Sequence, residues 1–452
     1  MSTDLFLMLL FSLTTFYFII GLMTSYKVTS VNDYFLANRH VGILPLTFTL
    51  VATQLGSGLL LGTAARAYTM GLWGILYTVG ISLGFLLLGF GFAAQLQSLN
   101  IATTAQIFEN RYHSYNLKLF ASFVSIISLW GILVAQIIAC HQIFISCGID
   151  DPRWLIGFWI MLISYTMMGG LRSVIIIDTL QVIFILIIFS LVFYYALPNN
   201  FLQSISFSKI IALQKHYFKA EYTLASLLPV VISSALFSLI EQDLAQKFFA
   251  ARSALTATIA AFLASIIVTL FACIPLYFGI MAKIKGCSVP HDVSPLLPYI
   301  QSMSSELVYA LIICALIAAI ASTADSLLCA ISSHIAQDFS KFLPQSNKLM
   351  SSKIVTLITG AAALGIAFYI SSDIIFILEQ SYRFSISCLF VPTVIAYFTP
   401  HVKKESATLA IICGSISFVA VQLFLPHSIM QDIIPLTLSL LGYQVGAILS
   451  KN

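Results

Sequence analysis

Charged residues are scarce in this chain of 452 residues: Asp, Glu, Lys and Arg make up 8% of it, whereas hydrophobic residues make up 60%. A soluble domain carries about 25% charged residues, so this sequence cannot cover the surface of a soluble protein of its size. The apolar residues gather in runs long enough to cross a hydrocarbon core of about 30 Å as helices. Lipid admits only helices and closed barrels as spanning structures, and the strand alternation of a barrel is lacking. The sequence therefore predicts an all-α polytopic membrane protein.

Metal-binding and catalytic patterns are lacking as well. The eight cysteines show no CxxC spacing, and no two of the eight histidines fall at the spacing of metal ligands. We therefore expect no redox metal, no disulfide and no cofactor. No base and nucleophile converge, which argues against an enzyme. The net charge of +4 is spread over the loops, so we expect no nucleic-acid partner, and no obligatory protein partner is evident.

Thirteen apolar runs are candidate transmembrane helices. They lie near residues 5–25, 43–69, 72–96, 117–146, 154–169, 173–196, 223–249, 255–282, 305–339, 353–371, 374–398, 405–425 and 430–449. The first run lacks a basic leader and a cleavage site, so we expect a retained helix rather than a signal peptide.

Basic residues in the connections predict the orientation of these helices. If the first helix starts outside, the cytoplasmic loops carry Lys27, Arg39, Arg111, Lys118, Arg172, Lys247, Arg252, Lys341, Lys348, Lys353, Lys403, Lys404 and Lys451. The opposite loops carry Arg66, Arg153, Lys209, Lys215, Lys219, Lys283 and Lys285. Cytoplasmic loops are enriched in Lys and Arg. The larger first group therefore predicts a multi-pass cell-membrane protein with its N-terminus outside and its C-terminus in the cytoplasm.

A polar group interrupts the ninth run, in the stretch AAIASTADSLLCAISSH at 318–334. Ser322, Asp325, Ser326, Cys329 and Ser333 are spaced at i, i+3, i+4, i+7 and i+11, so they share one face of a helix. Serines alone would fit a seam of small residues between helices. Hydroxyls with a carboxylate on the same face indicate a site for a hard cation instead.

The second and seventh runs contain interruptions of a different kind. LVATQLGSGLLLG, at 50–62, carries three glycines, which weaken a helix and free backbone carbonyls. FSLIEQDLAQKFFAARS, at 237–253, carries Glu241, Gln242 and Asp243 in succession, which fits either unwound backbone or a helix end at the interface. A packing face is the alternative for the glycines. Paired broken helices in two halves are the sequence sign of a transport site at the membrane midplane.

Two further polar groups lie inside apolar runs. GGLRSVIIIDTLQ, at 169–181, places Asp178 one to two turns inside a helix, where it is either a buried ligand or an interfacial cap. Glu379, Gln380 and Arg383 are close together in the eleventh run, and Glu379 and Arg383 are spaced to form an ion pair at i, i+4. An ionisable group at bilayer depth is costly and is therefore a functional candidate.

These motifs, in this order, resemble the sodium:solute symporter family, which includes sodium/proline, sodium/pantothenate, sodium/sialate and sodium/glucose carriers. The resemblance starts at DYFLANR, at 33–39. The motifs that support it most strongly are GGLRSVIIIDTLQ and ASTADSLLCAISSHIAQD. It implies a LeuT-type core of five plus five inverted-repeat helices. That core would occupy residues 31–400, with repeats near 43–196 and 223–398, after an additional helix in 1–30 and before two helices in 401–452.

The resemblance also implies where sodium binds. The shared sodium site of the family would use the carbonyls of Ala52, Leu55 and Ala319 with the hydroxyls of Ser322 and Thr323. A broken helix supplies the carbonyls and a packed helix supplies the hydroxyls.

Some members of the family hold a second cation, which the resemblance places near Asp178, Asp325 and Ser326. These carboxylates could carry protons instead, since burial raises the pKa of a carboxyl group. The solute would lie between the broken helices, near Gln54, Ser57, Phe237, Glu241, Gln242 and Gln380.

The resemblance thus implies a symporter that imports a small organic solute with Na⁺ as coupling ion, by alternating access. Sugar is not the expected solute, because the acidic residue and the lysine of sugar carriers are missing from the third and eighth runs. An amino acid or a small carboxylate is favoured. The alternative within the same fold is proton coupling through Asp178, Asp325 or Glu241.

Overall fold

The computed structural model describes residues 3–197, 214, 216–218, 224–287, 294–344, 347–370, 374–399, 401–425 and 430–449. Within these residues every regular element is helical, and one isolated backbone bridge joins Val41 to Ala251. The predicted all-α class is confirmed. Lys209, Lys215, Lys219 and Lys451, which were used to predict the orientation, lie outside the described residues.

The first half of the chain is built from the following helices: α1 Thr3–Ser25, α2 Val31–Leu36, α3 Ile43–Gln54, α4 Thr63–Met70, α5 Leu76–Leu87, α6 Ala93–Ser98, α7 Gln106–Tyr112, α8 Tyr115–Ser146 and α9 Pro152–Ala196. The second half contains α12 Leu224–Ser238, α13 Gln242–Phe249, α14 Ala254–Ile284, α15 Leu296–Met303, α16 Glu306–Asp338, α17 Lys348–Ala367, α18 Ile374–Ser385, α19 Val391–Phe398, α20 Lys404–Phe424 and α21 Met430–Leu449. Short π-helical turns at Gly58–Gly62, Leu88–Phe92 and Ile386–Phe390 continue several of them.

Eleven helical runs among the described residues are long and apolar enough to cross a membrane. Two of them exceed one span: Gly58–Ser98 has 41 residues and Pro152–Ala196 has 45. Each is interrupted at a glycine with positive φ, +66° at Gly71 and +56° at Gly170. The polytopic helical architecture is confirmed, whereas the exact number of thirteen spans, the domain division and the orientation stay predictions.

The turn at Gly170 requires glycine for two reasons. Its φ is positive, a conformation that costs other residues energy. A Cβ added there would also lie 2.4 Å from the carbonyl oxygen of Tyr34. The close approach holds α2 against the middle of α9, where the helix changes direction.

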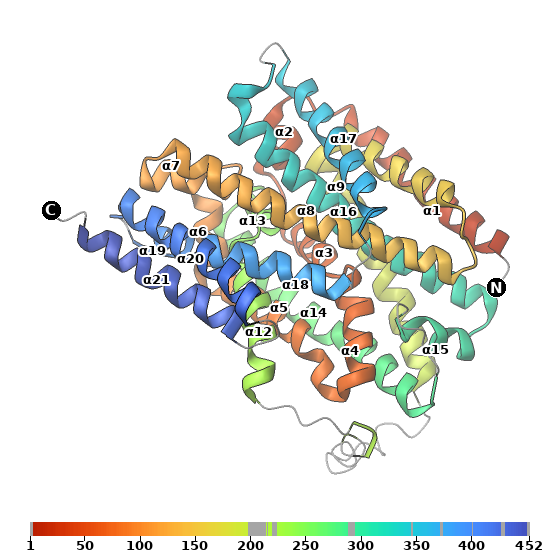
Figure 1. Cartoon of the computed structure of the whole chain (residues 1–452). Coiled ribbons are helices and arrows are strands. Elements are labelled where there is room, and N and C mark those ends of the chain that lie inside the picture. The colour runs from red at the N-terminus through yellow and green to blue at the C-terminus, as the bar shows by residue number, and fades with distance from the viewer. Residues whose placement is uncertain are drawn as a thin grey trace.

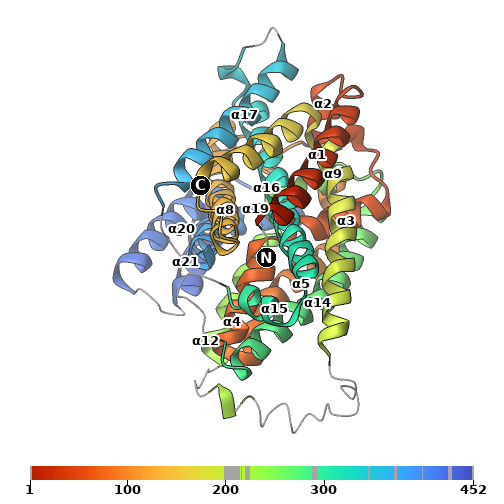
Figure 2. The same cartoon turned by 90° about the vertical axis from the view of Figure 1, so that its right-hand side faces the viewer.

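The helices pack around α16, which lies in the middle of the bundle and contacts α8, α9 and α17 (Figure 1). In α16, 83% of the apolar segment is buried, against 28% in α1 and in α21. The paired helices α20 and α21 lie on the opposite flank from α1 in both views (Figure 2). The polar side chains in the middle of α16, among them Ser322, Thr323, Asp325 and Ser326, are buried against other helices.

Both predicted helix breaks are present. The helix α3 ends at Gln54, and the chain bends at Leu55 and Gly56 before the helix resumes. The helix α12 ends at Ser238, and α13 begins at Gln242. Since Glu241 is only 6% exposed, the second break is enclosed by protein, which favours unwound backbone over a helix end at the interface.

Candidate ion and solute site

Two hydroxyls of α16 reach the carbonyl oxygens at the end of α3. Ser322 Oγ lies 3.1 Å from Ala52 O and 2.9 Å from Ala319 O. Thr323 Oγ1 lies 3.0 Å from Thr53 O, 3.2 Å from Ala319 O and 3.5 Å from Ala52 O. All five residues are buried. We call them the hydroxyl–carbonyl cluster.

The end of α3 leaves carbonyl oxygens of the hydroxyl–carbonyl cluster without their usual helical partners. The N–H of Ser57, one helical turn after Thr53, donates to Gln136 Oε1 instead, and the hydroxyls of Ser322 and Thr323 reach Ala52 O and Thr53 O. A dehydrated cation could be coordinated by the remaining lone pairs of these carbonyl and hydroxyl oxygens. The predicted residues Ala52, Ala319, Ser322 and Thr323 are thus brought together. The carbonyl of Leu55, in the adjoining bend, stays a prediction as a ligand.

Glycine and a buried amide shape the break that exposes these carbonyls. A Cβ added at Gly56 would lie 2.5 Å from Thr323 Oγ1 and 3.1 Å from Gln136 Oε1. Gln136, in α8, accepts a hydrogen bond from the backbone N–H of Ser57 at 3.1 Å. The absence of a side chain at residue 56 lets α16 approach the backbone, and Gln136 satisfies an amide that the break leaves without a helical partner.

A lysine occupies the centre of a second polar group. Lys247, in α13, was expected in a cytoplasmic loop, and this prediction is wrong because its side chain is 1% exposed. Its Nζ donates to Ser326 Oγ at 2.8 Å and to Thr49 O at 2.9 Å, and it also contacts Thr53 Oγ1. Asp178 Oδ2 lies 3.4 Å from the same nitrogen. We call Thr49, Thr53, Asp178, Lys247 and Ser326 the lysine cluster.

The two buried carboxylates predicted for a second cation have different neighbours. Asp178 Oδ2 also accepts a hydrogen bond from the hydroxyl of Thr49. Asp325 Oδ2 accepts one from the hydroxyl of Tyr165, in α9, at 3.0 Å. Both side chains are fully buried. The structure therefore brings Asp178 and Ser326 together around an ammonium group, while Asp325 faces Tyr165.

The predicted solute residues meet between the two broken helices. Gln54 Nε2, at the end of α3, donates to Glu241 Oε2, at the start of α13, at 3.2 Å. The ring of Phe237 stacks on that of Tyr382 with centroids 4.4 Å apart, and the hydroxyls of Tyr382 and Tyr77 lie 2.8 Å apart. An amide, a carboxylate and aromatic rings thus lie together between the two helix breaks.

Two polar atoms near these residues have no hydrogen-bond partner among the described residues. They are the hydroxyl of Ser57 and Oδ2 of Asp243. Both side chains are buried. Buried polar groups are almost always satisfied, so a ligand with polar groups of its own would complete this region.

Two predicted solute residues point elsewhere. Gln242 is tied to the loop after α6, accepting from Thr104 N at 2.7 Å and donating to Ala102 O at 3.0 Å. Gln380 accepts from Gln422 Nε2, in α20, at 2.6 Å. The amides of both residues are engaged outside the space between the breaks, so we remove them from the candidate solute site.

The ion pair expected between Glu379 and Arg383 belongs to a larger network. Its two side chains are 3.8 Å apart. Glu379 also pairs with Arg66, and Arg383 Nε lies 2.9 Å from Asp432 Oδ1. These residues tie α18 to α4 and α21, so both arginines of the network are engaged by carboxylates.

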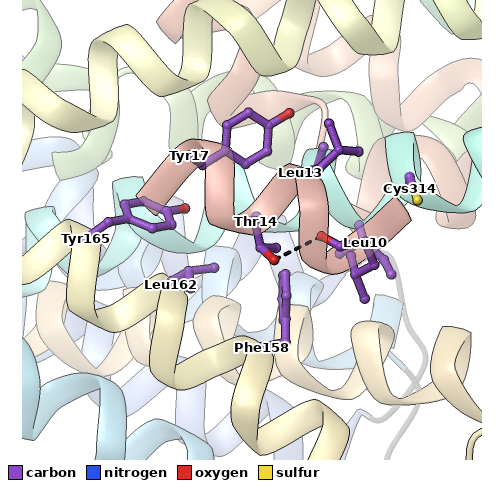
Figure 3. Close-up of a pocket in the computed structure, with 11 residues that line it drawn as sticks. Leu10, Leu13, Thr14, Tyr17, Phe158, Leu162, Tyr165 and Cys314 are labelled. Atoms are coloured by element: carbon purple, nitrogen blue, oxygen red, sulfur yellow. Dashed lines mark hydrogen bonds between the residues drawn. The ribbon is translucent and has the colours of Figure 1, made fainter. Parts of the chain in front are cut away.

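Figure 3 shows a different pocket, between α1, α9 and α16. Its walls are apolar except for Thr14, Tyr17 and Tyr165, and the hydroxyl of Thr14 donates to Leu10 O at 2.9 Å within α1. Tyr165 connects this pocket to Asp325. The walls offer no charged group, so the pocket does not compete with the polar clusters as an ion site.

Comparison with known proteins assigns most of the chain to one family. The model of the sodium:solute symporter family matches residues 34–414. The sodium/pantothenate symporter of Escherichia coli (strain K12) is 31% identical over 166 residues, 35% of this chain and 34% of that protein. The sodium/glucose cotransporter 1 of Ovis aries is 26% identical over 166 residues, 35% of this chain and 24% of that protein. These matched stretches thus span about a third or less of the curated relatives.

Solved structures share the fold over almost the whole chain. A Na⁺-coupled sialic acid symporter in a substrate-bound outward-open state superposes with a TM-score of 0.81 at 19% identity and covers 98% of this chain and 97% of its own. Mhp1, a transporter of the nucleobase-cation-symport-1 family, superposes in a closed conformation with a TM-score of 0.61 at 11% identity, covering 92% and 94%. At these identities the similarity concerns the fold.

Proposed function

Because the chain belongs to the sodium:solute symporter family, we propose that it imports a small organic solute together with Na⁺ by alternating access. The observation that carries the proposal is the hydroxyl–carbonyl cluster, where two buried hydroxyls face three carbonyl oxygens across α3 and α16. A cation bound there would connect a broken helix to the central helix. Its binding would favour one relative arrangement of α3 and α16. Such a preference is required for coupling Na⁺ movement to solute movement.

The energy available is sufficient for such transport. One charge moving through 100 mV releases about 2.3 kcal/mol. Since about 1.4 kcal/mol corresponds to a tenfold ratio, a single Na⁺ could concentrate a neutral solute roughly fifty-fold.

The solute site favours a molecule that carries an amine. Glu241 and Asp243 are carboxylates buried at the second break, and Gln54 offers an amide beside Glu241. A buried carboxylate is stabilised by a cationic partner. We therefore favour an amino acid over a small carboxylate without an amine, and both over sugar. The solute would contact Gln54, Ser57, Phe237 and Glu241.

Uptake into proteoliposomes tests this proposal. Purified protein is reconstituted, and uptake of labelled amino acids, small carboxylates and sugars is measured with an inward Na⁺ gradient, with K⁺ in its place, and with a proton gradient alone. We expect Na⁺-dependent uptake of at least one amino acid, reduced in Ser322→Ala. Ser332→Ala is the matched control, because Ser332 lies on the same helix and its hydroxyl donates to Leu328 O.

The proton-coupled alternative rests on the buried carboxylates Asp178, Asp325 and Glu241. It predicts uptake that persists without Na⁺ and increases at acid pH. That result, with no effect of Ser322→Ala, would replace sodium coupling by proton coupling.

A further inference from the structure

We infer that the ammonium group of Lys247 is a built-in cation that fills the position of a second cation, so that this chain couples transport to one Na⁺ only. The inference rests on the proposed function, because it concerns the stoichiometry of the same coupling. It concerns the lysine cluster, which adjoins the hydroxyl–carbonyl cluster and shares Thr53 with it.

The surroundings of Lys247 Nζ are those of a bound cation. Four oxygens of three kinds surround it: the carboxylate of Asp178, the hydroxyls of Thr53 and Ser326, and the carbonyl of Thr49. The lysine side chain is 1% exposed and that of Asp178 is fully buried. Carboxylate, hydroxyl and carbonyl oxygens are also the ligands that hard cations take in proteins.

The ammonium and a second Na⁺ would compete for the same oxygens. Lys247 is covalently attached to α13, so its ammonium is present at a high local concentration in every molecule. An additional cation beside it would experience the repulsion of a buried positive charge, which is screened little in a dry interior. Asp178 would have to balance both charges.

Within the lysine cluster the charges of Lys247 and Asp178 balance each other. The neighbouring Asp325 accepts from the hydroxyl of Tyr165 at 3.0 Å, so Asp178 is the carboxylate in contact with the ammonium. A buried charge requires a partner. Lys247 is that partner for the carboxylate of Asp178, so this carboxylate needs no ion from solution.

The lysine cluster also connects the broken helices. Thr49 and Thr53 lie in α3, Lys247 in α13, Asp178 in α9 and Ser326 in α16. Thr53 accepts from Lys247 with its hydroxyl and from Thr323 with its carbonyl oxygen. The tethered ammonium therefore holds the same helices that Na⁺ would hold at the neighbouring cluster.

The test is the number of Na⁺ ions bound per chain, measured with ²²Na⁺ on the full-length protein in detergent. We expect one ion in the wild type and two in Lys247→Ala, where the ammonium is removed and Asp178 remains. Lys118→Ala is the matched control: Lys118 is a buried lysine paired with Glu109, and its loss should leave one ion.

A second variant covers the case in which Lys247→Ala does not fold. The charge-neutral pair Lys247→Met with Asp178→Asn removes both buried charges together, so neither is left without a partner. It should still bind one Na⁺, because Asp178 is not a sodium ligand in the wild type.

The outcomes separate the two proposals. Two ions in the wild type, one ion in folded Lys247→Ala, or a large loss of sodium affinity in the charge-neutral pair would each overturn the role of Lys247 while leaving sodium symport intact. No Na⁺ binding to the wild type would contradict the proposed function itself.

Discussion

The carbonyl oxygen of Thr53 accepts a hydrogen bond from the hydroxyl of Thr323 at 3.0 Å. The first residue lies where α3 breaks, and the second lies on the buried face of α16. This contact links α3 at its interruption with α16, the most deeply buried of the spanning helices described. An ion coordinated by both oxygens would take the place of this hydrogen bond and would alter how the two helices fit together.

Removing either hydroxyl of the hydroxyl–carbonyl cluster should weaken sodium dependence. Loss of one oxygen ligand comparable to a hydrogen bond costs about 1 kcal/mol, or about a fivefold loss of affinity. We expect Ser322→Ala and Thr323→Ala each to raise the Na⁺ concentration for half-maximal uptake by at least this factor. Unchanged values in both variants, with Ser332→Ala as the reference, would show that the site is wrongly assigned.

Gly56→Ala should disrupt the same site through packing. The new Cβ would lie 2.5 Å from Thr323 Oγ1, and overpacking a buried position costs about 1–3 kcal/mol. We expect sodium-dependent uptake to fall while the protein still reaches the membrane. Gly365→Ala, where no atom lies within 4 Å of the added Cβ, is the control and should retain full uptake.

Glu241→Gln should reduce solute affinity and leave sodium affinity unchanged. The amide can still pair with Gln54 but cannot balance the charge of an amine. Since a hydrogen bond to a charged group contributes about 1.5–3 kcal/mol, the apparent solute affinity should fall about tenfold or more. Solute titrations at saturating Na⁺ would measure it. Equal losses for an amino acid and for its amine-free analogue would rule out an amine contact.

Gly170→Ala should destabilise the protein more than Gly148→Ala. Both glycines have positive φ, +56° and +77°, which costs an alanine about 1–2 kcal/mol. Only at Gly170 does the added Cβ also overlap with Tyr34 O. Thermal unfolding in detergent would compare the two, and equal losses would show that the contact with α2 is unimportant.

The sequence was sufficient to predict the helical class and both helix breaks. Apolar runs and intramembrane polar groups are strong signals, because lipid leaves few ways to satisfy a backbone. The positions of Ser322, Thr323, Asp178 and Glu241 inside such runs identified them as candidates for the same reason.

The directions of long side chains could not be predicted. Gln242 and Gln380 lie in α13 and α18, beside the candidate solute site. The amide of each residue, however, forms a hydrogen bond with a neighbour outside that site. Lys247 was counted among the loop residues although it lies within the predicted run 223–249, and its burial depends on acceptors from three other helices. Its place in the apolar run 227–249 was the available signal.

Sodium-specific stabilisation of the purified protein tests the central claim most directly. Thermal unfolding is measured in NaCl, KCl and choline chloride at matched ionic strength, for the wild type, Ser322→Ala and Ser332→Ala. A ligand at about a hundred times its dissociation constant stabilises by about 2.7 kcal/mol. We predict a higher unfolding temperature in NaCl alone, with a smaller increase in Ser322→Ala and the full increase in Ser332→Ala. Identical unfolding in the three salts would contradict a sodium site between α3 and α16.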